Sequence, residues 1–443
     1  MCSLSNRSNA QEKDSSNPFF SAYQTPFEVP PFDQIKPGHF LPAIEQGIEE
    51  QTNEINNIIN NPAEPDFENT IAALDNSGSL IRKVNSVFSN LNSANTNREL
   101  QAIAKQIAPK LSAHYDNINL NPLLFARIKT VFDKRTELNL SKEQMRLLDD
   151  RYKGFIRGGA ALTGVQQERF RQINKLLSTL TLQFGENVLA ETNNYKLVID
   201  NQDDLNGLPV SLIEQGAEAA RDAGLEGKWV FTLHNPSVMP FLQYAENREL
   251  REKIYTAYIN RGNNGNEHDN NELIKQIASL RLEKAKMLGY ESHAAFVLEE
   301  NMAKNAANVV DLLQKLWEPA LKRAQMEAAG LNSIIAREGG QFSLQPWDWR
   351  YYAEKLRKEK YDLDDESLKP YFALENVKQG IFMVANKLYG ISFTERKDIP
   401  VHHPDVMAYE VKEADGRHIG ILYMDFFPRE SKRGGAWMNS YRK

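Results

Sequence analysis

The stretch FENTIAALDNSGSLIRKVNSVFSNL, residues 67–91, predicts the fold class of this chain. Its apolar side chains recur at steps of three, four and seven residues: Phe67, Ile71, Leu74, Ile81, Val84, Phe88 and Leu91. That spacing places them on one face of a helix, as in helices that pack against a core. A similar stripe runs through residues 41–58, and Pro62 and Pro65 break the backbone between the two stripes. We therefore expect an antiparallel helical hairpin.

The helical spacing continues along most of the chain. A third helix is expected to start at Leu100, and further helical patterns occupy residues 147–152, 170–184, 273–288, 309–321 and 351–356. No sequence repeat of fixed period is present, which disfavours a regular solenoid. The sequence thus predicts a mainly α fold.

Two regions have the residue content of strands. Residues 195–200 and 229–233 are short β-branched and aromatic runs, and they flank an expected helix at 210–223. Residues 406–411 and 418–425 are expected to form a hairpin around Asp415-Gly416, a two-residue turn that permits positive φ at both central positions. A small β-hairpin or sheet is therefore expected near the C-terminal end.

Composition excludes several classes of protein. The 443 residues are 41% hydrophobic and 25% charged, which is typical of globular proteins. Acidic residues number 59 against 53 basic ones, and no block of like charges forms a nucleic-acid footprint. No apolar run reaches the roughly 18 residues needed to span a bilayer. We expect no nucleic-acid partner and no transmembrane segment.

The one cysteine, Cys2, excludes an internal disulfide framework and a thiolate zinc site. It opens a polar tail, residues 1–20, that has too little apolar surface to fold and is expected to be disordered. This start resembles that of a mature bacterial lipoprotein, which makes Cys2 a candidate lipid attachment site in the periplasm or cell envelope. The alternative is a frayed terminus on a cytoplasmic protein.

A search for catalytic groups within the sequence finds none. There is no Gly-x-Ser-x-Gly elbow and no phosphate-binding loop. The eight histidines include no pair at i, i+4 with a glutamate after the first, the spacing of a zinc-binding helix. His402 and His403 are adjacent, so in extended backbone they point to opposite faces, and we interpret them as structural or solvent-exposed. No catalytic or metal-ligating residue is therefore assigned in this chain.

Two further clusters are given structural interpretations. Residues 267–269, Glu-His-Asp, are interpreted as part of a solvated loop between helices. The aromatic cluster of Trp347, Trp349, Tyr351 and Tyr352 is interpreted as helix-packing core. Residue spacing alone therefore predicts only a large α-rich protein.

Blocks of sequence along the chain resemble a known family. They include PFDQIKPGHFLPAI (31–44), FIRGGAALTGVQQERF (155–170), TLQFGENVL (181–189), YAENRELREKIYTAYINRG (244–262), LRLEKAKMLGY (280–290), the stretch from PWDWRYYAEKL to NVKQGIF (346–382), LYGISF (388–393), HHPDVMAYEV (402–411) and GILYMDFFPRESKRGGAWM (420–438). In order and spacing they resemble the thimet-oligopeptidase-like zinc metallopeptidases, and within these the peptidyl-dipeptidase branch. The resemblance covers about residues 20–443.

The resemblance implies an elongated multi-helix ellipsoid with a deep channel, in which short peptides are cleaved. It also implies that zinc is held by a His-Glu-x-x-His helix and a further glutamate, all C-terminal to the block at 432–436. Only seven residues follow that block here. We therefore expect a truncated chain that binds no zinc and is inactive alone, with zinc in the full-length protein. The missing C-terminal portion, as a separate fragment, is a candidate partner besides the peptide substrates.

The resemblance divides the chain into a tail at 1–20, a helical region at 21–340 that forms one side of the channel, and an incomplete catalytic region at 341–443. The candidate substrate-binding residues are Arg429, Gly434, Gly435, Ala436 and Trp437. Small residues there would let a peptide backbone approach closely, and a strand edge nearby could bind it by strand addition. The alternative is a tight turn with surface glycines and an Arg429 that serves as a structural ion-pair partner.

The expected activity of the full-length protein is removal of C-terminal dipeptides from short peptides. An endo-acting oligopeptidase of the same family is the first alternative. A non-catalytic helical peptide-binding protein that kept the cleft is the second.

Overall fold

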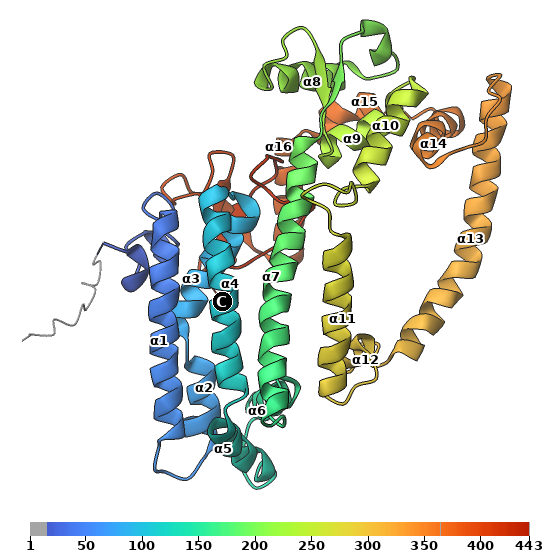
Figure 1. Cartoon of the computed structure of the whole chain (residues 1–443). Helices are drawn as coiled ribbons and strands as arrows, with labels where there is room; N and C mark the ends of the chain where they lie inside the picture. Colours follow the sequence, from blue (N-terminus) through green and yellow to red (C-terminus); the bar gives the residue numbers. More distant parts are fainter. Residues whose placement is uncertain (1–15, 364, 443) are drawn as a thin grey trace, which may run out of the picture. The chain divides into compact units, whose positions relative to one another are not determined.

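The computed structural model describes residues 16–363 and 365–442, and these form two compact units (Figure 1). Unit 1 contains residues 16–160, 393–427 and 438–442. Unit 2 contains residues 161–363, 365–392 and 428–437. The mainly α fold with small antiparallel sheets is confirmed. The ellipsoidal shape, the channel and the functional division at residue 340 stay predictions.

The predicted helical hairpin forms the centre of unit 1. Its helices are α1 (Phe40–Ile59) and α3 (Ser79–Ala94), and α4 (Arg98–Asn119) lies beside them (Figure 1). Ile44, Ile81 and Val84 from the predicted stripes are almost fully buried. Gly47 of α1 permits a close approach, since a Cβ there would lie 3.0 Å from the backbone nitrogen of Ile81. The stripes read from the sequence therefore meet as expected.

The helix predicted over residues 67–91 is interrupted in the structure. It forms a π-helical turn η4 (Phe67–Ala72), a short α2 (Ala73–Asn76) and then α3. Between α2 and α3, Gly78 has a φ of +73°, and a Cβ there would lie 2.5 Å from the Gln51 side chain. The Gln51 carbonyl oxygen accepts from His114 Nε2 at 2.8 Å, while its amide donates to Ser77 Oγ at 3.1 Å. The helix is interrupted between α2 and α3, and this buried polar cluster packs at the interruption.

Two helices and three short turns complete the helical part of unit 1. The helices α5 (Pro122–Asp133) and α6 (Lys142–Arg157) bury Leu124, Ile128 and Leu148 in a second core. Before α1, the chain makes the 3-10 turns η1 (Pro18–Phe20), η2 (Pro26–Glu28) and η3 (Pro37–His39).

The predicted C-terminal hairpin belongs to a three-stranded antiparallel sheet of unit 1. Its strands, in spatial order, are β3 (Ser392–Glu395), β4 (Met407–Lys412) and β5 (His418–Met424). Met407 pairs with Met424, and Lys412 pairs with His418. Tyr409 and Ala408 of β4 are buried, whereas Ile419 of β5 is 48% exposed. The hairpin is confirmed, and β5 lies at the edge of this sheet.

The turn of this hairpin differs from the predicted two-residue type. The Glu413 amide donates to the Arg417 carbonyl at 2.9 Å, which leaves residues 414–416 as a three-residue loop. The Gly416 amide donates to the Glu413 carbonyl at 3.0 Å, and of the Asp415-Gly416 pair only Gly416 has a positive φ, +87°. The prediction was wrong here because a turn followed by a left-handed glycine also matches the strand twist and needs only one positive φ.

Unit 2 is helical around a two-stranded sheet. The predicted strands appear as β1 (Leu197–Ile199) and β2 (Trp229–Phe231), with α8 (Val210–Asp222) between them in sequence. Phe231 and Phe241 are fully buried in the core beside them. The other elements are α7 (Val165–Asn194), η5 (Gln202–Leu205), α9 (Asn235–Tyr244), α10 (Arg248–Ile259), α11 (Asn271–Met287), α12 (His293–Leu298), α13 (Ala306–Arg337), α14 (Pro346–Tyr361), α15 (Asp365–Leu368), η6 (Lys369–Phe372) and α16 (Leu374–Tyr389).

A buried ion cluster joins α10 to the first turn of α14. Asp348 is fully buried and accepts from Arg251 Nη2 at 2.8 Å and from Arg248 Nη2 at 2.9 Å. Arg251, only 1% exposed, also donates to the Ala245 carbonyl at 2.7 Å. The Asp348 carboxylate further caps α14 by accepting from the Gln345 amide at 3.1 Å. One carboxylate thus fixes both the start of α14 and its contact with α10.

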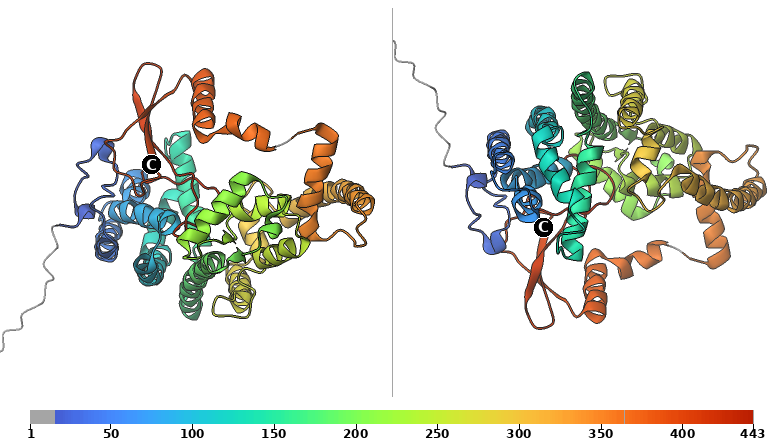
Figure 2. Two further views of the ribbon diagram at one scale, coloured as in Figure 1. Left: turned by 90° about the horizontal axis from the view of Figure 1, so that it is seen from above. Right: turned by 90° about the horizontal axis from the view of Figure 1, so that it is seen from below.

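The aromatic cluster predicted to be helix-packing core is confirmed as such. Tyr352 is 6% exposed and packs against Leu331, Ile334 and Ile335 of α13, with Trp349 and Tyr351 at the edge of this cluster. Figure 2 shows α13 at one end of unit 2, with α14 crossing it near its C-terminal end. None of the helices in the described part of the chain has the length and apolarity needed to cross a membrane.

We predict that Asp348→Asn lowers the free energy of unfolding of unit 2 by about 3–5 kcal/mol, because it leaves a buried arginine without its counter-charge. Urea denaturation would measure the loss. The control is Asp311→Asn, which removes a solvent-exposed ion pair with Lys315 on α13 and should cost less than about 0.5 kcal/mol. Equal losses in the two variants would contradict the importance given to the buried cluster.

Candidate functional site

The predicted substrate-binding residues lie in segment 428–437, which belongs to unit 2 although the residues on either side of it belong to unit 1. The segment contains no helix or strand. It starts with a turn in which the Lys432 amide donates to the Arg429 carbonyl at 2.9 Å. Its attachment point is the end of α7, where Asn193 Nδ2 donates to the Glu430 carbonyl at 2.9 Å. A packed helix therefore holds one end of this irregular segment.

Trp437 makes its contacts within the segment. The Arg433 guanidinium lies 4.8 Å from the centre of the Trp437 ring, and the Lys432 ammonium lies 6.0 Å from it. Such contacts hold the indole by cation–π attraction. Trp437 is half-buried, so part of the ring remains available for another contact.

The small residues Gly434, Gly435 and Ala436 are exposed. Gly435 has a φ of +95°, and a Cβ added at either glycine would meet no atom within 4 Å. Open space on these glycines is compatible both with the approach of a peptide backbone and with a surface turn. Their role in substrate binding stays a prediction, as does that of Arg429.

The end of α7 gathers a polar cluster that the sequence did not indicate. Glu191, 8% exposed, accepts hydrogen bonds from Asn264 and Asn266, the latter at 2.5 Å. Asn187 donates to the Asn270 side chain at 2.9 Å, and both side chains are buried. The loop interpreted as solvated is therefore exposed, but Asn264 and Asn266 near its tip and the buried Asn270 at its base tie it to α7. Buried amide groups need such partners, and only the fold brings them together.

His234 is a second residue that sequence reasoning did not single out. It precedes α9, and its Nδ1 lies 3.0 Å from Thr232 Oγ1. Its Nε2 is buried and has no hydrogen-bond partner among residues 16–363 and 365–442. Burial lowers the pKa of His234, Glu430 opposes that shift and Arg261 adds to it. His234 thus lies in electrostatic range of segment 428–437, as a neutral imidazole near neutral pH.

The adjacent histidines of unit 1 have separate structural partners. His402 Nε2 lies 3.3 Å from Asp425, and its side chain is 4% exposed. His403 Nδ1 lies 3.4 Å from Asp405 instead. Tyr441, whose pKa is raised by burial and then by Tyr423 and Asp425, places its hydroxyl 3.4 Å from His402 Nδ1. Each histidine thus has its own side-chain partner, and the structural interpretation of this pair stays a prediction.

The described residues do not fit a zinc site. Between residues 16 and 442, position 364 excepted, no three His, Cys, Asp or Glu side chains come together as metal ligands. His402 pairs with Asp425, whereas His403 pairs with Asp405, so the two histidines do not converge on one tetrahedral ion. Cys2, the candidate lipid attachment site, lies outside the described residues.

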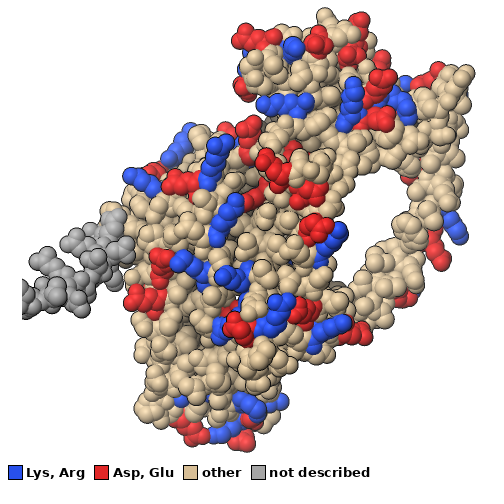
Figure 3. All heavy atoms as spheres, viewed as in Figure 1, with Lys and Arg blue, Asp and Glu red and all other residues tan. Residues whose placement is uncertain are grey.

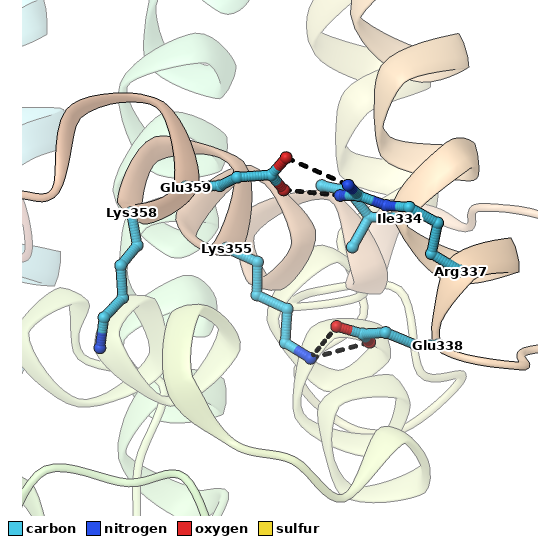
Figure 4. A pocket seen from close by; sticks show the side chains of 6 residues that line it. All are labelled: Ile334, Arg337, Glu338, Lys355, Lys358 and Glu359. Atoms are coloured by element: carbon cyan, nitrogen blue, oxygen red, sulfur yellow. Dashed lines mark hydrogen bonds and ion pairs between the residues drawn. The ribbon is translucent and has the colours of Figure 1, made fainter.

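Open cavities in the described part of unit 2 include one between α13 and α14 and one along α10. One, of about 540 Å³, lies between α13 and α14 (Figure 4) and is lined by Ile334, Arg337, Glu338, Lys355, Lys358 and Glu359. Figure 4 shows Glu359 of α14 meeting Arg337 at 2.6 Å and Lys355 meeting Glu338 at 2.7 Å, while Lys358 points away. These charged side chains pair with one another between α13 and α14. The cavity is therefore a gap within the contact between the two helices.

The second cavity, of about 720 Å³, follows the exposed side of α10. Its lining is polar and of mixed charge: Tyr195, Glu249, Glu252, Lys253, Thr256, Ala257, Asn260 and Asn264. Asn264 also binds Glu191, so this groove borders the polar cluster at the end of α7. This groove offers hydrogen-bond donors and acceptors along α10.

Comparison with known proteins gives a consistent result. Residues 241–443 match the profile of peptidase family M3. The dipeptidyl carboxypeptidase of Salmonella typhimurium (strain LT2) is 39% identical over 428 residues, which are 96% of this chain and 63% of the relative. The Escherichia coli (strain K12) dipeptidyl carboxypeptidase is 38% identical over 426 residues, again 96% and 63% of the two chains. Oligopeptidase A of Escherichia coli is 33% identical over 419 residues, 94% of this chain and 62% of the relative. The chain thus spans less than two thirds of each relative.

We predict that Gly435→Ala raises amide exchange in segment 428–437 about tenfold, because a side chain at a positive φ costs about 1–2 kcal/mol. Hydrogen–deuterium exchange followed by mass spectrometry would measure it. Gly434→Ala is the matched control: the same open space surrounds it and its φ is not in the left-handed region, so its exchange should not change. Equal exchange in both variants would show that the conformation at Gly435 does not order the segment.

Proposed function

We propose that this chain is the substrate-binding portion of a zinc metallopeptidase that removes C-terminal dipeptides from short peptides, because residues 241–443 match the profile of peptidase family M3 and the chain is similar to dipeptidyl carboxypeptidases. The zinc ligands and the catalytic glutamate would come from residues that this sequence does not include. By itself the chain would bind peptides and leave them uncleaved. No step through zinc is assigned to its residues.

The observation that carries this proposal is the order of similarity. The two dipeptidyl carboxypeptidases are 39% and 38% identical to this chain, and the Escherichia coli oligopeptidase A is 33% identical over nearly the same length. This favours release of dipeptides over internal cleavage. The similarity to oligopeptidase A keeps an endo-acting oligopeptidase as the second candidate.

Within the chain, segment 428–437 is our candidate for contact with the peptide. The exposed residues 434–436 leave the backbone open, so its amide and carbonyl groups could pair with those of an extended peptide. Trp437 would supply an aromatic surface for a substrate side chain, with Arg433 holding the ring in place. Arg429 would keep the turn at the start of the segment, through its carbonyl, rather than select the substrate.

The test is a peptide assay of the chain in the presence of zinc. An N-blocked tetrapeptide with a free C-terminus should bind and remain intact, since the chain would lack the catalytic residues. Trp437→Ala should weaken binding about tenfold, as removal of a buried aromatic contact does. Met438→Ala is the matched control, because Met438 is 92% exposed and adjacent, and it should bind as the parent chain does.

Three outcomes would change this proposal. Dipeptide release by the chain alone would show that its own residues are catalytic. Internal cleavage, once the rest of a family member is supplied, would favour the oligopeptidase alternative. Peptide binding without any cleavage after such reconstitution would favour the non-catalytic peptide-binding protein.

We also propose that the native protein is lipid-anchored through Cys2 in the bacterial periplasm or cell envelope, with the cytoplasm as the alternative. The support is the polar tail that the one cysteine opens. We expect the mass of the native protein to exceed that of the polypeptide by a diacylglycerol group. An unmodified Cys2 in the mass spectrum of protein purified from its own cells would remove the anchor.

A further inference from the structure

Helix α13 carries a long apolar stripe that is open to solvent. At 100° per residue one face collects the apolar side chains, namely Val309, Leu312, Leu313, Leu316, Trp317, Ala320, Leu321 and Ala324. Every residue from 310 to 323 is exposed, and Trp317 is 65% exposed. Monomeric proteins seldom leave so contiguous an apolar surface in water.

The same stripe is covered at the other end of the helix. Leu331, Ile334 and Ile335 lie on the same face of α13 as the stripe, at further helical steps of three and four residues. They are at most 4% exposed because α14 packs on them. One face of a single helix is thus buried over its last two turns and uncovered over the preceding turns. A surface that continues an existing core contact is built for a further contact of the same kind.

The opposite face of α13 is largely polar. On that face Asp311 and Lys315 form an ion pair of 2.6 Å, and Glu318 and Lys322 lie on the same side. In Figure 3 the helix stands apart from the rest of unit 2, with an open gap beside it and few charged side chains on its visible face. The helix is therefore amphipathic, with a solvent face and an unpartnered apolar face.

Helix α16 of the same unit repeats this feature. Val377, Ile381, Val384 and Leu388 fall at steps of three and four residues, and they are between 39% and 67% exposed. Two long amphipathic helices of one unit thus lack a cover on their apolar faces. A partner that satisfies both needs an extended apolar surface of its own.

We infer that the apolar stripe of α13, residues 309–324, is the docking surface for a helical polypeptide equivalent to the part of the dipeptidyl carboxypeptidases that this chain does not match. More than a third of the Salmonella typhimurium relative lies outside the aligned part. Such a polypeptide has the length to offer amphipathic helices to α13 and, at the same time, to α16. Helix-on-helix packing would bury the leucines and Trp317 on apolar side chains of the partner.

A second copy of this chain would be a poorer partner. Pairing of two α13 stripes would cover that helix alone and leave the stripe of α16 in water. The inference deepens the proposed function, because it names the surface on which the rest of the peptidase would assemble. It concerns binding, however, and does not require that the complex cleave peptides.

The test uses the unmatched part of the Salmonella typhimurium relative, both as a separate polypeptide and fused to this chain through a flexible linker. Hydrogen–deuterium exchange of α13 is the measurement. We expect amides at 309–324 to exchange at least about tenfold more slowly in the mixture or the fusion than in the chain alone. The fusion keeps the experiment decisive if the separate polypeptide does not fold.

Substitutions locate the contact. Leu316→Glu places a charge in the centre of the stripe and should weaken association at least about tenfold, since an unpaired charge is costly to bury. Ala329→Glu is the matched control: it adds the same charge to the opposite face of α13, where residue 329 is exposed, and should leave association unchanged. In the fusion, Leu316→Glu should abolish the protection of α13, and the control variant should retain it.

Other results would overturn the inference. Unchanged exchange at 309–324 in both the mixture and the fusion would mean that the stripe does not bind this polypeptide. Protection of α13 in the chain alone, rising with concentration and lost in Leu316→Glu, would assign the stripe to a second copy. Protection without dipeptide release would retain the docking surface and count against the proposed activity, so the two claims fail separately.

Discussion

The buried carboxylate of Asp348 is the interaction on which the arrangement of unit 2 depends. A carboxylate with no exposed surface must be neutralised, and Arg248 and Arg251 of α10 supply the charge at 2.9 and 2.8 Å. Because Asp348 also caps α14, the position of that helix is fixed by the same group. α14 in turn covers the last turns of α13. A single buried charge therefore fixes the start of the helix that covers the end of α13.

The two surfaces that we propose for binding both belong to unit 2. The end of α7, held by amide and carboxylate hydrogen bonds, carries segment 428–437 with its open glycines and Trp437. The apolar stripe of α13 begins where the cover by α14 ends. Exposed glycines mark the first, and exposed apolar side chains mark the second. A peptide would use the first of these surfaces, and a helical polypeptide the second.

Much of the fold was predictable because apolar periodicity is a local property of the chain. The helices around α1 and α3, the strands β1 and β2 and the hairpin of β4 and β5 follow from spacing and residue type. The break at Gly78 was not predictable, since it depends on Gln51, which is distant in sequence and shares its side chain with Ser77 and His114. The hairpin turn was predicted with the wrong length because Asp-Gly fits two loop types.

The sequence by itself determined the fold class, the family resemblance and the candidate residues 429–437, because motifs and periodicity are written in neighbouring residues. Only the tertiary structure decided that Asn193 holds that segment, that His234 lies within electrostatic range of Glu430, and that the stripe of α13 is half covered. The physical reason is the same in both cases. Hydrogen bonding and burial are satisfied between residues far apart in the chain, so which groups are paired and which faces stay open depends on packing that no local pattern encodes.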